Sequence, residues 1–361
     1  MLNVLVHLSS SFGLGFASYF FRTQGVEFYK IMLVWAIAPL VSLPIVVLCN
    51  NWNTRKYLGY GIVSYTGMAL SLLAFNRYSF LLFGVFHGLV LGYFWVSFNY
   101  IFFLKSTNNE HARDVSIYFI IGPLIGIILP PLGALVIHNA SFKALFIITS
   151  LLSLLPLFYT QSKHFDYRLN LSFREANQSF KGLRLIAFYN NALHYFQDGF
   201  LPVYVLLFLK TEYQVGALMS YLALLSLVVS FGLAYASDKL KRRVEILYPL
   251  MILMAALIMI MPSLKNLAPL VTLIGIYAIV DNLSQPIRFA IPMDMRKTDI
   301  GFWRAGEFYG NVGRVIVFSV SSLLIYLGNY WLPFVIFALL AVSFPFIASQ
   351  KTKSLRRSAS P

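Results

Sequence analysis

The sequence has little charge for its length. Charged residues make up 11% of the 361-residue chain and hydrophobic residues make up 59%, whereas about a quarter of a typical soluble domain is charged. The mean hydropathy is +0.73. A soluble fold would leave large apolar patches exposed to water and would aggregate. The composition therefore predicts an integral membrane protein.

Cysteine and enzyme motifs are also scarce. Cys49 is the only cysteine, so no disulfide can form within the chain, and we expect it to be a small apolar residue near a helix end. The sequence contains no His/Cys metal-ligand spacing, no phosphate-binding glycine loop and no Gly-x-Ser-x-Gly nucleophile. It thus predicts a protein that is not an enzyme and uses no cofactor and no metal. Without an ATP-binding motif, active transport would have to use an ion gradient.

The net charge of +15 would suggest nucleic acid as a partner for a soluble protein. Here the Lys and Arg residues fall between apolar runs, so membrane topology explains them better and we expect no nucleic-acid partner. With the N-terminus inside, the cytoplasmic loops and tail hold 19 of the 28 Lys and Arg residues and the outer ends hold six. Because positive residues favour the cytoplasmic side, we predict a multi-pass protein of the cell membrane with both termini in the cytoplasm.

Twelve apolar segments are long enough to cross the membrane, since a spanning helix needs about 20 mostly apolar residues. The predicted spans are 3–21, 28–48, 58–75, 79–103, 115–137, 143–160, 184–209, 214–236, 246–263, 267–291, 303–326 and 330–348. No cleavable signal peptide is predicted before the first of them.

The longest polar stretch, residues 161–183, divides the predicted spans into two groups of six. We predict an N-terminal bundle at 1–160, a cytoplasmic linker at 161–183 and a C-terminal bundle at 184–348. A basic cytoplasmic tail, expected to be disordered, follows at 349–361. The predicted fold class is therefore an all-α membrane protein of two six-helix bundles.

Basic loops occupy matching places in the two halves. The loop between predicted spans eight and nine contains Asp238, Lys239, Arg242 and Arg243, and the loop between spans two and three contains Asn51, Arg55 and Lys56. Together with the twelve spans, these loops resemble those of the major facilitator superfamily (MFS) of secondary transporters. Both loops lack glycines of the family pattern, and Asn51 stands where the family has aspartate.

The resemblance implies two pseudo-symmetric bundles that work by alternating access around a central cavity lined by spans one, four, seven and ten. It also implies that Asp238 caps a helix of the opposite half and holds the cytoplasmic side shut, whereas the uncharged Asn51 caps more weakly. Gly122-Pro123-Leu124-Ile125-Gly126 resembles an antiporter motif of exporters, but Phe80 stands where exporters often have arginine. Import and export both stay open.

Polar side chains within the predicted spans gather in the second half of the chain. Because an ionisable group in a span is costly, it usually faces a cavity or a partner, and spacings of three, four and seven place such groups on one helical face. We predict a substrate and proton pathway formed by Asn191, His194, Gln197, Asp198, Asp281, Asn282, Gln285 and Arg314. Weaker candidates lie in the first half. They are His7, Ser9, Ser10 and Ser11 in span one and His87, Tyr93, Trp95, Asn99 and Tyr100 in span four.

Three acids and three bases balance within spans seven, ten and eleven. We expect Arg314 to pair with Asp281 or Asp198, and the remaining carboxylate to carry a proton. A static network of salt bridges is the alternative. The residues nearer the cytoplasmic ends, and those in the two basic loops, are predicted to act in gating: Asn51, Arg55, Asp238, Arg242, Arg288, Arg304 and Glu307.

The sequence thus favours proton-coupled secondary transport of a small solute by a monomer in the bilayer. The alternative is a membrane receptor or assembly protein that keeps the fold but transports nothing, whose charges would be fully paired and whose cavity would be filled. The substrate stays open among sugars, organic acids, peptides and amphipathic drugs.

Overall fold

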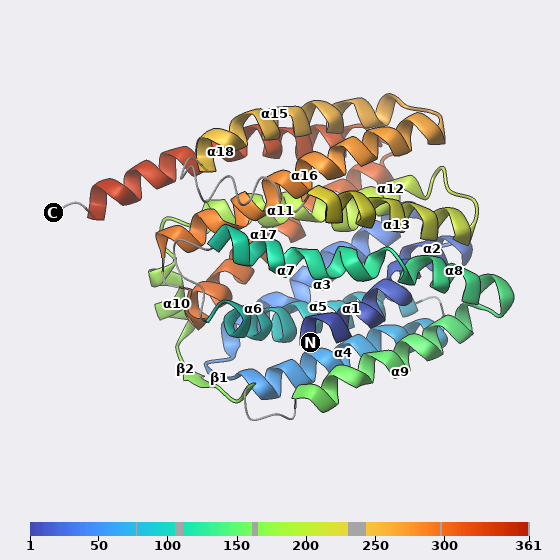
Figure 1. The fold of residues 1–361 in the computed structure, drawn as a ribbon, viewed down its shortest axis with the longest axis horizontal. Coiled ribbons are helices and arrows are strands. Elements are labelled where there is room, and N and C mark those ends of the chain that lie inside the picture. Colours follow the sequence, from blue (N-terminus) through green and yellow to red (C-terminus); the bar gives the residue numbers. More distant parts are fainter. Residues whose placement is uncertain (77, 105–110, 161–164, 230–242, 297, 360–361) are drawn as a thin grey trace.

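The structure, a computed structural model, describes residues 1–76, 78–104, 111–160, 165–229, 243–296 and 298–359. Figure 1 shows long helices that run side by side along the longest axis of the molecule. The short strands β1 (Asn51–Asn53) and β2 (Arg168–Asn170) lie with helix α10 (Phe173–Ser179) at one end of the bundle. We call this the linker end, and the opposite end the far end.

The helices of the first half follow the predicted spans closely. They are α1 (Leu2–Phe12), η1 (Leu14–Phe16) and α2 (Ala17–Thr23), then α3 (Phe28–Leu48), α4 (Thr54–Leu73), α5 (Ser79–Leu89), η2 (Val90–Trp95) and α6 (Val96–Phe103), then α7 (His111–Gly126), α8 (Leu129–Asn139) and α9 (Phe142–Thr160). Breaks near Gly13 and Ile128 divide two of the predicted spans into shorter helices.

The second half continues after the linker. Its helices are α11 (Arg184–Tyr195), η4 (Phe196–Phe200) and α12 (Leu201–Val205), then α13 (Glu212–Val229), α15 (Arg243–Ile260), η5 (Met261–Ser263), α16 (Leu267–Met295), α17 (Ile300–Tyr326) and α18 (Leu332–Ala359). Helix α18 runs on beyond the predicted last span to Ala359. The predicted disorder of the tail from residue 349 is therefore wrong up to that residue, because the last helix does not stop at the end of its apolar stretch.

Among the described residues, ten helices are long and apolar enough to cross a membrane. Two further segments, α4 and the continuous run α11–η4–α12, lie where the third and seventh spans are predicted. The run from α11 to α12 carries the polar side chains of the predicted pathway, which lower its hydropathy. Together, these segments are consistent with the predicted twelve spans.

The polar linker has a defined structure at the linker end. Strand β1 pairs antiparallel with β2, with Asn51 opposite Asn170. Helix α10 begins with a capping box, in which the Ser172 hydroxyl and amide each donate to Glu175 at 2.8 Å and lower the pKa of that carboxyl group. The linker therefore binds the first basic loop through a backbone ladder.

Asn51 does not have the predicted capping role. It lies exposed in strand β1 rather than at the N-terminus of a helix of the second half. The nearby Asn53 caps α4, a helix of its own half, by accepting a hydrogen bond from the Lys56 amide at 2.8 Å. The reason is the pairing with β2, which holds residue 51 in an extended strand. Asp238 and Arg242, the matching residues of the second half, lie outside the described residues.

Helices α3 and α5 approach each other closely at Gly88. A Cβ atom at this position would overlap the Ala38 carbonyl oxygen and lie 2.6 Å from Val41 Cβ. Close helix pairs in membranes depend on such small residues. Gly59 of α4 provides the contrast, because a Cβ atom there would meet only Leu157 Cδ1, at 3.8 Å.

We expect Gly88→Ala to destabilise the protein and Gly59→Ala not to. The added methyl group at position 88 forces α3 and α5 apart, and overpacking of this kind costs about 1–3 kcal/mol. At position 59 the methyl group fits, and the higher helix propensity of alanine favours the folded state. Melting temperatures of the two purified variants would test this. Equal melting temperatures would mean that α3 and α5 are not packed as described.

Candidate functional site

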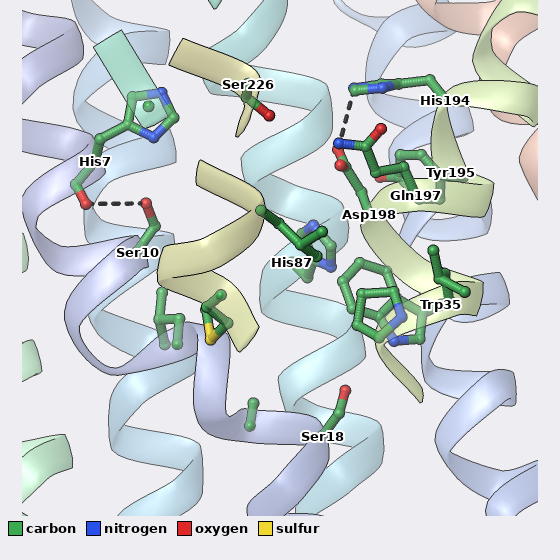
Figure 2. A pocket seen from close by; sticks show the side chains of 18 of the residues that line it. His7, Ser10, Ser18, Trp35, His87, His194, Tyr195, Gln197, Asp198 and Ser226 are labelled. Atoms are coloured by element: carbon green, nitrogen blue, oxygen red, sulfur yellow. Dashed lines mark hydrogen bonds and ion pairs between the residues drawn. The ribbon is translucent and has the colours of Figure 1, made fainter. Parts of the chain in front are cut away.

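A cavity of about 540 Å³ lies between helices of the first half and helices of the second half. Side chains from α1, α3, α5 and α7 line one side, and side chains from α11, α13, α16 and α17 line the other. The volume is in the range of small-molecule sites. Figure 2 shows His7 and Ser10 on one side of the cavity and His194, Tyr195, Gln197 and Asp198 on the other.

The cavity extends further toward the far end than toward the linker end. Its lining includes Ser18, Tyr19 and Leu209, close to the far-end termini of their helices. Toward the linker end it stops near Glu307, and aromatic rings pack below that level. Phe103 stacks on Trp303 with ring centroids 5.2 Å apart, and Trp303 stacks on Phe289 at 5.9 Å. These rings come from both halves, and Phe289 also forms part of the cavity wall at its linker-end side.

Asp198 is the carboxylate that faces the cavity most openly. Its side chain is 47% exposed, and its Oδ2 atom lies 3.1 Å from His194 Nε2. His194 Nδ1 lies 2.8 Å from Gln285 Nε2 on α16. As oriented, the Gln285 amide donates to Nδ1, so the imidazole is neutral and its Nε2–H donates to Asp198. The three side chains form a polar chain from α16 to the cavity.

The backbone around Asp198 is not a regular α-helix. Residues Phe196–Phe200 form a π-helical segment between α11 and α12. Such bulges are frequent at functional sites, where they redirect side chains. Gln197, in the same segment, also lines the cavity, and its Oε1 atom is buried without a protein partner among the described residues.

Arg314 has a different partner from the predicted ones. Its Nη1 atom lies 2.6 Å from Glu307 Oε1 and donates to Asn311 Oδ1 at 2.6 Å, while Nη2 donates to Asn191 Oδ1 at 2.6 Å. The guanidinium group also lies over the Tyr195 ring, 4.2 Å from its centroid. The predicted pairing with Asp281 or Asp198 is wrong, because Glu307 is on the same face of α17, two turns away.

Asp281 pairs with Arg288, again two turns along its own helix. Their side chains are 1% and 0% exposed, and Arg288 Nη1 also lies 3.5 Å from Asn190 Oδ1. Asp281 does not line the cavity, so its place in the predicted pathway is corrected to a buried ion pair. Arg288, predicted to act in gating, is the partner in this pair.

The other predicted pathway residues line the cavity. Asn282 Nδ2 donates to Ser226 Oγ at 2.7 Å and thereby joins α16 to α13. The predicted residues on the wall are Asn191, His194, Gln197, Asp198, Asn282, Gln285 and Arg314. Glu307, predicted as a gating residue, is also on the wall.

Sequence reasoning missed several aromatic side chains of the wall. Trp35, Tyr65 and Tyr195 line the cavity, together with the weaker candidates His7, His87, Trp95 and Asn99. In a chain with 17% aromatic residues, nothing in the sequence distinguishes these rings from those that face lipid. Among the described residues, no cluster of three or more His, Cys, Asp or Glu side chains is placed to hold a metal ion.

Arg304 joins the two halves at the linker end. Its guanidinium group donates to the Val46 carbonyl at 2.8 and 3.2 Å and to the Leu171 carbonyl at 2.5 Å, and it lies over the Trp52 ring at 5.6 Å. Val46 is in α3 and Leu171 is in the linker. One buried side chain of α17 therefore holds the first half and the linker. Arg55, also predicted to act in gating, is the second residue of α4.

Comparisons with known proteins identify the family to which this architecture belongs. The sequence profile of the Major Facilitator Superfamily matches residues 2–302. No curated protein sequence matches the chain.

Several solved structures have a similar fold. The Escherichia coli fucose:proton symporter FucP is 14% identical, with 97% of both chains covered and a TM-score of 0.66. A POT family transporter in complex with 5-aminolevulinic acid is 12% identical, with 98% of this chain and 95% of the other covered and a TM-score of 0.70. A bacterial homologue of the iron transporter ferroportin in an outward-facing state is 12% identical, with 98% of both chains covered and a TM-score of 0.68.

We expect Asp281→Asn to destabilise the protein strongly, because it leaves the buried Arg288 without its counter-charge. Breaking a buried pair from one side costs about 3–5 kcal/mol. The double variant Asp281→Leu/Arg288→Met removes both charges and should recover most of the loss. Glu27→Gln, which breaks the exposed pair with Lys30, is the control and should leave the melting temperature unchanged. A double variant no more stable than the single one would contradict the pair described here.

Proposed function

Since this chain belongs to the major facilitator superfamily, we propose that it is a secondary active transporter that moves a small solute by alternating access, with a proton as the coupling ion. The family and the fold make it a multi-pass membrane transport protein. One observation carries the finer proposal: the cavity between the halves reaches Asp198, whose side chain is 47% exposed.

This cavity separates transport from its alternative. A receptor or assembly protein with the same fold would have a filled interior and fully paired charges. Here Arg314 and Asp281 are paired, but Asp198 faces open space with the neutral His194 beside it. A charged group at the middle of a span is expensive, so its position on a cavity wall favours a function that uses it.

Hydrogen bonds across the two halves at both ends support alternating access. Arg304 and the pair Asn311–Ser42, at 2.9 Å, join α17 to α3 toward the linker end. At the far end, the Tyr19 hydroxyl lies 3.4 Å from the Lys210 carbonyl oxygen. The Ser322 hydroxyl also donates to the Tyr29 carbonyl oxygen at 2.8 Å at this end. Because these contacts join different bundles, they can break without unfolding either one. We therefore treat 1–160 and 184–348 as the two moving bundles, with 161–183 as the linker.

Asp198 is our candidate for the proton carrier. A carboxylate changes its preference for a proton when its surroundings change from a wet cavity to a closed one. His194 from the same helix contacts it directly, and Arg314 of α17 and Asp281 of α16 interact with it electrostatically. Asp281 is a weaker candidate, because its pairing with Arg288 keeps it away from the cavity.

The predicted topology completes the proposal. We infer that the linker end faces the cytoplasm with both termini, since the first basic loop and the basic residues of the linker lie there. The protein would act as a monomer in the cell membrane. In this orientation, the cavity extends toward the outside and the aromatic rings of the linker end close it from the cytoplasm.

Asp198→Asn should abolish proton coupling, because the amide cannot exchange a proton. The purified protein would be reconstituted into liposomes that contain a pH-sensitive dye, and solutes from the classes of sugars, organic acids, peptides and amines would be added outside. We expect at least one class to drive proton movement with the wild type and with Glu27→Gln, and none with Asp198→Asn. Proton flux retained in Asp198→Asn, or absent for every class in the wild type, would refute the proposal.

Arg304→Ala should open the linker end. Its loss removes charged hydrogen bonds, each worth on the order of 1.5 kcal/mol, so we expect Cys49 to react with a maleimide about tenfold faster. Cys49 is half-buried at the end of α3, three residues after Val46. As the only cysteine of the chain it needs no background substitution. Arg174→Ala, at an exposed position of α10, is the matched control. An unchanged rate in Arg304→Ala would exclude the gating role.

A further inference from the structure

We propose that the solute is an organic cation, with a protonated amine that binds Asp198 and an apolar or aromatic body that packs against Trp35. This inference rests on the proposed transport function and names the chemical class of its substrate. It follows from the charges of the cavity wall and from the side chains around Asp198.

The charges of the wall do not balance. Its acidic residues are Asp198 and Glu307, and its basic residue besides histidine is Arg314. Glu307 and Arg314 neutralise each other at 2.6 Å. With His194 neutral, the described wall keeps one uncompensated negative charge, at Asp198. Surroundings of low dielectric strengthen the attraction of this charge for a cation.

Arg314 is poorly placed to attract an anion instead. Its two terminal nitrogen atoms already donate to Glu307, Asn311 and Asn191, and the face of its guanidinium group lies over Tyr195. The residue is 5% exposed. A carboxylate substrate would have to displace Glu307 to reach it and would also face the charge of Asp198.

Aromatic rings surround the position next to Asp198. Gly199 follows Asp198, and a Cβ atom there would lie 3.2 Å from Trp35 Cδ2, so the indole packs directly against this part of the helix. The Trp35 ring is perpendicular to Tyr195, at 6.0 Å, and to His87, at 5.2 Å. Figure 2 shows Trp35 on the same side of the cavity as Asp198, whose carboxylate lies nearer to His194 and Gln197. A carboxylate and an aromatic ring on the same side of a cavity can together bind an organic cation, the carboxylate through its charge and the ring through its face.

The test uses three ligands of similar shape that differ in charge. At neutral pH, 2-phenylethylamine is a cation, 2-phenylethanol is neutral and 3-phenylpropionate is an anion. Because a ligand that binds the folded state raises its stability, we expect the amine to raise the melting temperature of the purified full-length protein and the other two to have little effect.

Variants separate the charge from the aromatic wall. Asp198→Asn should weaken amine binding by about tenfold or more, as expected for the loss of a charged hydrogen bond. Asp198→Glu keeps the charge and should retain measurable binding, which also shows that the site tolerates substitution. Trp35→Leu should weaken binding by about threefold to tenfold. Trp331→Leu, at an exposed tryptophan of the far end, is its control.

Each outcome has a defined meaning. Stabilisation by the anion, or equal stabilisation by all three ligands, would overturn the assignment of charge, and so would no stabilisation by any of them. Amine binding that Asp198→Asn leaves unchanged would also overturn it. If the amine fails while another solute class drives Asp198-dependent proton flux, the substrate class is wrong and the transport proposal stands. If the amine binds but no solute moves protons, the site is right and coupled transport is wrong.

Discussion

The structure depends on one constraint: each charge that α11, α16 and α17 carry into the bundle must find a partner there. Lipid offers none, and an unpaired buried charge costs more than the bundle can tolerate. Two arginines meet this constraint along their own helices, Arg288 with Asp281 and Arg314 with Glu307. Both pairs span two helical turns, a separation of about 10 Å along the axis that the long arginine side chain bridges. The charged helices are therefore largely neutral before they meet the first half.

Ion pairs that form within one helix are compatible with the proposed movement of the two halves against each other. An ion pair between the halves would have to break in every cycle, whereas a pair within one helix moves with it. The polar contacts that cross between the halves include hydrogen bonds, such as those of Arg304 with Val46 and of Asn311 with Ser42. One contact between titratable groups also crosses, at the exposed far end, where His138 lies 3.1 Å from Glu212. Asp198 is the exception to internal pairing, and it is also the acid that most openly faces the cavity. Asp198 can lack an arginine partner because it faces the cavity, where water can solvate a carboxylate that has only a neutral histidine beside it.

Hydropathy and residue spacing were enough to predict most of the architecture. The span 28–48 coincides with α3, and seven of the eight predicted pathway residues line the cavity. Helical spacing identifies which face of a helix a side chain lies on, but not which side chain it pairs with. For this reason the predicted ion-pair partner of Arg314 was wrong. It also assumes a regular helix, so it cannot predict the π-helical segment that contains Asp198. The ladder between β1 and β2 was invisible for another reason: it joins residues more than one hundred positions apart, and each strand has only three residues.

The two halves contribute different chemistry to the cavity. The charged side chains of the described wall, Asp198, Glu307 and Arg314, come from the second half, whereas Trp35, His87 and His7 come from the first. A solute that contacts both the charged side chains of the second half and the aromatic side chains of the first half must touch both bundles at once. Its binding energy is then available only when the bundles are close together, because separating them removes one wall from the solute. A divided site of this kind makes the solute itself a contact between the halves, and so links occupancy of the cavity to the relative position of the bundles.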